Sequence, residues 1–141
     1  MNIPTPISRR RFLGGMACTL AAAGLPGCAA APVQRGVLRD DRLVLDLAET
    51  QAQMAGRPAI LVEAAGAPVQ FILIRQGDAW RALSALCTHQ NCQVRPQRHL
   101  LVCPCHGSTF DFDGQVTRGP APKALPAYRV EVGRDTLEIW L

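Results

Sequence analysis

The first 28 residues of the chain contain no acidic residue, and the rest of the chain has almost no net charge. The 141 residues include 15 Lys and Arg and 11 Asp and Glu, which gives a formal charge of +4. Because Arg9, Arg10 and Arg11 lie in the first segment, twelve basic and eleven acidic residues remain beyond it, a charge near +1. That part lacks the basic excess of a nucleic-acid-binding protein.

No internal repeat or heptad pattern is present, which argues against a repeat protein or a coiled coil. Short apolar runs and period-two alternation, broken by Gly and Pro, predict β-strands instead. Leu43, Leu45 and Leu47 alternate with polar neighbours, as in a half-buried strand. Further strands and hairpins are predicted over 59–64, 69–75, 80–86, 100–102, 110–116, 128–132 and 136–141. Residues 49–55 are predicted as one helical turn or a loop, so the predicted fold class is all-β, an antiparallel sandwich or small barrel.

Two motifs of cysteine and histidine are the most informative part of the sequence. They are C-T-H-Q-N-C at 87–92 and C-P-C-H-G-S at 103–108. Cys87 with His89, and Cys103 with His106, supply two thiolates and two imidazoles, the ligand set of a Rieske 2Fe–2S centre. Two neutral imidazoles in place of thiolates remove negative charge, which raises the reduction potential of such a centre.

Two further cysteines, Cys92 and Cys105, lie one in each motif and could bridge the two motifs. The alternative use of two Cys and two His is a structural zinc site. Zinc sites usually contain C-x-x-C pairs with a longer gap between them, and C-P-C-H leaves one cysteine unexplained. His99, in a polar segment between the motifs, is predicted to be a surface turn residue.

Both motifs resemble those of the Rieske iron–sulfur protein family, of the disulfide-bearing type found in cytochrome bc complexes. The family pattern is C-x-H-x-x-C and C-x-C-H-G-S, and the resemblance covers roughly residues 37–141. It implies one 2Fe–2S cluster in a β-sandwich whose two loops bind the cluster. The implied site consists of Cys87 and Cys103 on one iron, His89 and His106 on the other, a structural Cys92–Cys105 disulfide, Ser108 bonded to a cluster sulfide, and a proline loop with Gly119, Pro120 and Pro122.

Two positions depart from the family pattern. Gln90 stands where the family often has a leucine that shields the face docking on a quinol site, which implies a more polar docking surface. Phe110 stands where high-potential members have a tyrosine that donates a hydrogen bond to a cysteine sulfur. We therefore expect a potential below that of quinol-oxidising relatives, within the Rieske range of about −150 to +300 mV.

The N-terminus has the features of an export signal. Residues 8–13, S-R-R-R-F-L, form a twin-arginine motif followed by an apolar stretch. Twin-arginine transport carries folded proteins, which suits a cluster assembled in the cytoplasm, and it delivers the domain to a compartment where a disulfide persists. The predicted organisation is a signal at 1–31, a linker at 32–36 and one Rieske domain at 37–141. Cys28 is a candidate for lipidation, and the alternatives are an uncleaved membrane anchor or cleavage near 29–31.

The sequence favours one-electron transfer in the periplasm, on a membrane tether, with a c-type cytochrome or a periplasmic oxidoreductase as partner. No site for covalent catalysis and no second metal-binding domain of the kind found in Rieske oxygenases is recognisable. The alternatives are the Rieske subunit of a quinol-oxidising bc-type complex and the small subunit of a periplasmic molybdenum oxidase such as arsenite oxidase. A structural zinc module is the non-redox alternative.

Overall fold

The computed structural model describes residues 33–67 and 70–141, and it consists of short β-strands with a single short helix in these ranges. The elements are β1 (Val33–Arg35), β2 (Val37–Arg39), β3 (Arg42–Asp46), α1 (Leu47–Gln53), β4 (Ala59–Glu63), β5 (Phe71–Gln76), β6 (Ala79–Ser84), β7 (Arg95–Pro96), β8 (Leu101–Val102), β9 (Thr109–Phe110), β10 (Val116–Arg118), β11 (Ala127–Tyr128), β12 (Val130–Val132) and β13 (Thr136–Trp140). The all-β prediction is therefore confirmed.

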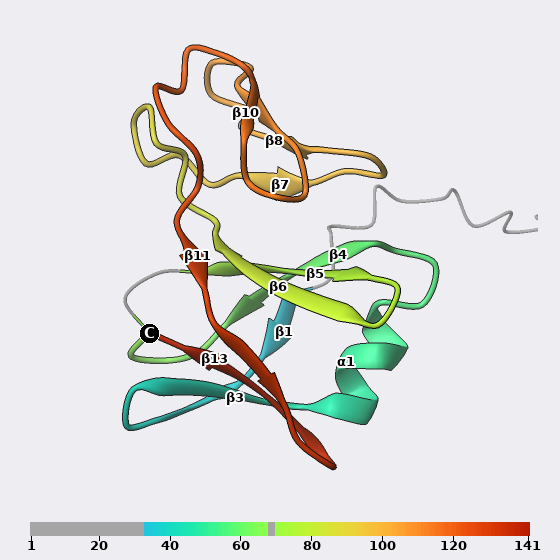
Figure 1. Cartoon of the computed structure of the whole chain (residues 1–141). Coiled ribbons are helices and arrows are strands. Elements are labelled where there is room, and N and C mark those ends of the chain that lie inside the picture. The colour runs from blue at the N-terminus through green and yellow to red at the C-terminus, as the bar shows by residue number, and fades with distance from the viewer. Residues whose placement is uncertain (1–32, 68–69) are drawn as a thin grey trace, which may run out of the picture.

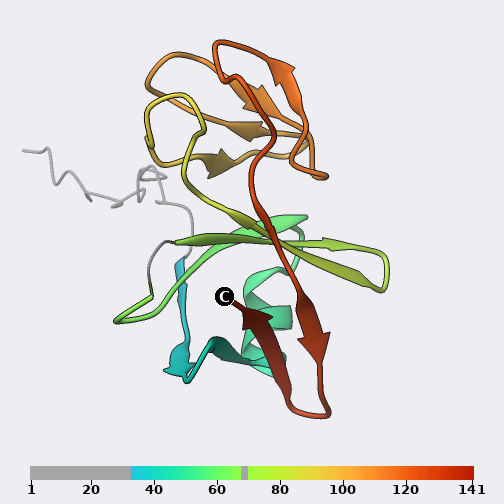
Figure 2. The same cartoon turned by 60° about the vertical axis from the view of Figure 1, so that its left-hand side comes forward.

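The strands form three sheets. A five-stranded sheet has the order β1-β4-β5-β6-β11, and a four-stranded sheet has the order β12-β13-β3-β2. A smaller sheet of very short strands, β10-β9-β8-β7, stands at one end of the molecule, where the chain leaves β6 and returns to β11 (Figures 1 and 2). This small sheet carries both cysteine–histidine motifs in its loops.

The five-stranded sheet is apolar on both faces because it lies between two cores. Its strands β4 and β5 consist largely of fully buried residues, in contrast to the alternating pattern of β3 and β13. Ile60 and Leu73 pack in the core shared with the sheet of β3 and β13. Leu61 and Ile72 face the other way, into the core that also contains residues of the small sheet. The small sheet is thus supported by the sandwich through a continuous hydrophobic contact.

The predicted hairpins and the predicted helical turn are present, with shifted ends. β4 pairs with β5, and β9 pairs with β10, both antiparallel. The helical turn expected over 49–55 is α1, which begins two residues earlier because Asp46 caps it: Asp46 Oδ1 accepts a hydrogen bond from the Glu49 amide at 2.7 Å. Leu47 therefore belongs to a helix and not to the preceding strand.

The prediction that residues 32–36 form a linker needs correction at residues 33–35. In the structure Val33–Arg35 forms β1, parallel to β4, and the side chain of Gln34 is fully buried. A Cβ added to Gly36 would come within 2.8 Å of Leu43, Leu45 and the Val44 carbonyl oxygen. Sequence patterns missed this strand because a parallel pair joins segments that are distant in the chain, and three residues are too few to show alternation. The folded domain therefore includes residues from Val33 onward.

The predicted export signal and Cys28 lie outside the described residues. Within residues 33–67 and 70–141, no helix has the length and apolar character needed to cross a bilayer.

Candidate metal centre

The first motif forms a tight turn closed by two backbone hydrogen bonds. The Asn91 amide donates to the Cys87 carbonyl at 2.9 Å, and the Cys87 amide donates to the Cys92 carbonyl at 2.8 Å. Asn91 has φ of 56°, in the left-handed region that asparagine tolerates better than most residues. Cys87 lies three residues after the end of β6, so the five-stranded sheet fixes its position.

The second motif repeats the same turn after β8. The Gly107 amide donates to the Cys103 carbonyl at 3.1 Å, and the Cys103 amide donates to the Ser108 carbonyl at 2.8 Å. Gly107, like Asn91, has a positive φ, here 75°. The two motifs are therefore two copies of one local structure, and each copy places its first cysteine at the inner side of the turn.

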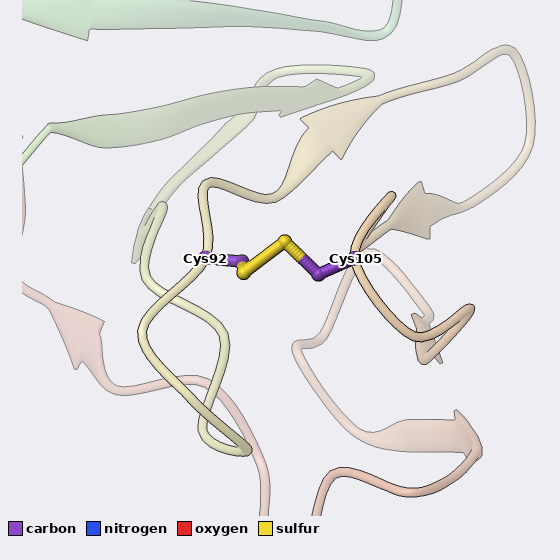
Figure 3. The surroundings of a disulfide bond; sticks show 2 residues. All are labelled: Cys92 and Cys105. Carbon is purple, nitrogen blue, oxygen red and sulfur yellow. A yellow bond between two sulfur atoms is a disulfide. The ribbon is translucent and has the colours of Figure 1, made fainter.

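A disulfide joins the two turns. Cys92 and Cys105 are bonded, with their Cα atoms 6.4 Å apart, and Figure 3 shows the bond connecting the two loops. The resemblance to the Rieske family implied this pairing, and the structure confirms it. Since the sulfurs of Cys92, Cys103 and Cys105 lie within 4.8 Å of one another, they also have metal-ligand spacing. Two of them are consumed in the disulfide, so Cys103 alone of these three is available as a thiolate ligand.

Cys87 and Cys103 are free thiols in the apolar core, with 0% and 1% of their surface exposed. Burial raises the pKa of the Cys87 thiol above its usual value, because a thiolate loses solvation there. Hydrogen bonds from the His89 amide and the Ser108 hydroxyl to the sulfur act in the opposite direction. Two neighbouring buried thiols with these donors fit a bound cation that takes up both as thiolates.

The two predicted histidine ligands meet at the surface side of the site. The ring centroids of His89 and His106 are 4.8 Å apart, and their planes are nearly perpendicular at 83°. His106 is exposed and His89 is half-buried. His89 Nδ1 is buried and has no hydrogen-bond partner among the described residues. An unsatisfied buried nitrogen costs about 1–3 kcal/mol, so it fits an atom that binds a metal. The donor set and this nitrogen together fit a centre with two Cys and two His ligands.

Hydrogen bonds hold the predicted proline loop against both turns, and its role as a cover of the cluster stays a prediction. Ser108 is fully buried, and its Oγ accepts a hydrogen bond from the Ala121 amide at 3.0 Å. Thr88 Oγ1 donates to the Lys123 carbonyl at 2.6 Å, which ties the first turn to this loop. The Gly119–Pro120 peptide bond is cis. Sequence reasoning missed the role of Thr88, for which its place between two predicted ligands was the available signal.

Other predicted residues lie where the sequence indicated. Gln90, Pro120 and Pro122 are exposed beside the site, and His99 is exposed in the turn between β7 and β8. Phe110 is fully buried in the same core cluster as Cys87 and Cys103. The structure thus brings the predicted Cys and His residues and Ser108 together, while their roles as ligands stay a prediction.

Residues 44–129 match the model of the Rieske [2Fe-2S] domain. The chain belongs to the Rieske 2Fe–2S domain family. The resident cofactor of the domain is therefore one 2Fe–2S cluster, which replaces the zinc alternative. The prediction of the family from the two motifs is confirmed.

Relatives and solved structures agree with this assignment. The chain is 29% identical to the cytochrome b6-f complex iron-sulfur subunit 2 of Nostoc sp. strain PCC 7120, over 100% of this chain and 88% of that protein. It is 37% identical to the corresponding subunit of Prochlorococcus marinus strain MIT 9515, over 59% of this chain and 48% of that protein. For several such relatives the match spans about half of their length. The plasma membrane Rieske protein PetC3 of Synechocystis PCC 6803 superimposes with a TM-score of 0.57 and 26% identity, over 68% of this chain and 95% of that structure.

Proposed function

We propose that this Rieske protein transfers single electrons through a 2Fe–2S cluster held by Cys87, Cys103, His89 and His106. The observation that carries the proposal is the arrangement of the two matching turns. They bring two buried free thiols and two adjacent imidazoles to one point, with the imidazoles on the surface side. When bound, the cluster supplies reversible one-electron chemistry at a potential raised by its neutral His ligands.

The residues around the site have distinct roles in this proposal. Cys87 and Cys103 anchor the buried side and keep it from water, while His106 provides the exposed edge through which an electron leaves. Ser108 and the proline loop restrict access from the third side.

We place the protein outside the cytoplasm, on a membrane tether. The twin-arginine motif at 8–13 and the lipidation candidate Cys28 support this placement. The Cys92–Cys105 disulfide adds independent support, since disulfides persist in oxidising compartments. Replacing Arg9 and Arg10 by Lys should retain the protein in the cytoplasm. Periplasmic accumulation of that variant at the wild-type level would contradict the proposed route.

The electron partner in this proposal is a c-type cytochrome or a periplasmic oxidoreductase. A second candidate is a subunit of a bc-type complex, because the relatives with near-complete coverage are named cytochrome b6-f complex subunits. Purification of the full chain from its native membranes in mild detergent separates the two. Co-purification with b-type haem supports the complex, whereas elution without haem supports the carrier.

The primary test is EPR of the dithionite-reduced full chain, with iron and zinc quantified on the same sample. We expect a rhombic signal with the low average g-value of a mixed Cys/His cluster, at about two irons per chain. His106→Ala should abolish the signal, and His99→Ala is the matched control because His99 is exposed in a turn of the same subdomain. Stoichiometric zinc without a signal, or an unchanged signal in His106→Ala, would contradict the assignment.

A further inference from the structure

We propose that the cluster end of the molecule docks an acidic electron-transfer protein through Arg118 and Lys123. The cluster end is defined here as the turns 87–92 and 103–108 with Arg118 and the proline loop 119–123. This proposal deepens the proposed function, on which it rests, by naming the charge of the partner surface.

Arg118 and Lys123 flank the proline loop at its two ends. Arg118 is the last residue of β10 and pairs in register with Thr109, the residue after Ser108. The Lys123 backbone holds the first turn through its hydrogen bond with Thr88. Both Arg118 and Lys123 are exposed. Figures 1 and 2 show the chain between β10 and β11 passing along the end of the small sheet that carries the turns.

No carboxylate compensates these two cations at the cluster end. The sequence has no Asp or Glu between Asp78 and Asp111, and none between Asp113 and Glu131. Both turns and the whole proline loop fall within these two carboxylate-free intervals. Among the described residues, neither Arg118 nor Lys123 has a carboxylate oxygen within 4.0 Å.

The two acidic residues of the β9–β10 turn are engaged with the sandwich and within the turn itself. Asp113 pairs with Arg81 of β6 at 2.9 Å, and Asp111 Oδ1 accepts the Asp113 amide at 2.9 Å. The neighbouring Gly114 lies against β6, since a Cβ there would be 3.2 Å from a Leu83 methyl carbon. Their negative charge therefore stays on the side of the sandwich, away from the docking edge.

Charges at the other end of the molecule are better balanced. Arg35, Arg42 and Arg129 each form an ion pair with a glutamate. The cluster end therefore carries exposed positive charge with no carboxylate in its own segments, and the exposed polar residue Gln90 lies in its first turn. An acidic surface around the cofactor of a partner complements such an edge, and steering of this kind raises association rates by about 10- to 1000-fold.

The test compares two acceptors that share one haem but differ in surface charge. The cluster-loaded full chain is reduced and mixed by stopped flow with a basic cytochrome c, or with its succinylated form, whose lysines carry carboxylates instead. We expect the succinylated form to be reduced at least about tenfold faster at low ionic strength, and this advantage to vanish near roughly 0.5 M salt.

Two double variants locate the effect on the molecule. Arg118→Glu with Lys123→Glu should reverse the preference between the two acceptors. Arg39→Glu with Arg134→Glu is the matched control, because it changes net charge equally at exposed positions of the β2–β3 and β12–β13 hairpins, far from the small sheet in Figure 1. This control should keep the preference. If the first double variant does not retain its cluster, Arg118→Gln with Lys123→Gln replaces it. We expect this variant to lower the rate advantage of the succinylated acceptor by about threefold or more.

Three results would overturn the proposal. One is equal or faster reduction of the basic cytochrome, and another is an equal loss of preference in the control variant. The third concerns lipid: if Arg118→Glu with Lys123→Glu abolishes binding to phosphatidylglycerol vesicles but leaves the acceptor preference intact, the cations bind a membrane. EPR of the same samples separates these failures from failure of the proposed function, which alone would remove the cluster signal.

Discussion

Loss of the Cys92–Cys105 disulfide should lower the stability of the domain by an amount that follows from the loop that it closes. The bond joins residues separated by 13 positions. In the chain-entropy model, a loop of this size restricts the unfolded chain by about 3 kcal/mol at 25 °C. For a domain of about 110 residues, with roughly 2 cal/mol/K of unfolding entropy per residue, this loss corresponds to a fall in Tm of about 10–15 °C.

The assay is a thermal scan of Cys92→Ser with Cys105→Ser, followed by far-UV CD and by the visible absorbance of the cluster at one scan rate. Reduction of the wild type with dithiothreitol should give the same fall by an independent route. Thr117→Ala is the control in the same small sheet, because it removes an exposed side-chain hydrogen bond to Thr109 and should cost below about 0.5 kcal/mol.

A fall of less than about 3 °C would refute this reasoning. In that case the backbone hydrogen bonds within each turn, together with the contact of Thr88 with the Lys123 carbonyl, would hold the loops without the covalent link. A fall equal to that of Thr117→Ala would lead to the same conclusion.

Three further substitutions test the site and the corrected domain boundary. Phe110→Tyr should raise the reduction potential by about 40–60 mV, because one hydrogen bond to a ligand sulfur is worth about 1–1.5 kcal/mol. A redox titration that shows no rise would contradict the interpretation of Phe110. Ser108→Ala should lower the potential by about 60 mV and destabilise the domain by about 1–3 kcal/mol, because it leaves the Ala121 amide without its acceptor. An unchanged titration of Ser108→Ala would show that its hydroxyl acts only on the proline loop. Gly36→Ala should lower the free energy of unfolding in urea by about 1–3 kcal/mol, since the added methyl group meets Leu43 and Leu45. An unchanged free energy of unfolding would support the original prediction of a linker in this segment.

Much of the site was predictable because its candidate ligands lie in two short sequence motifs. A thiolate and an imidazole two or three residues apart restrict what a turn can bind, so the ligand types followed from residues 87–92 and 103–108. The strands β3, β5 and β13 were also predictable, because alternation or a continuous apolar run marks each of them.

The two motifs were sufficient to predict the family, the cofactor and a set of candidate ligands, because these depend on local spacing and donor type. That β1 belongs to the domain became visible in the folded structure alone, since parallel pairing leaves no local signal. The folded structure also decided that Thr88 holds the proline loop and that Asp113 turns toward Arg81. Those contacts join segments 32 or more positions apart, and packing of the small sheet on β6 brings them together. The uncompensated charge of the cluster end follows from the carboxylate-free intervals of the sequence together with that packing.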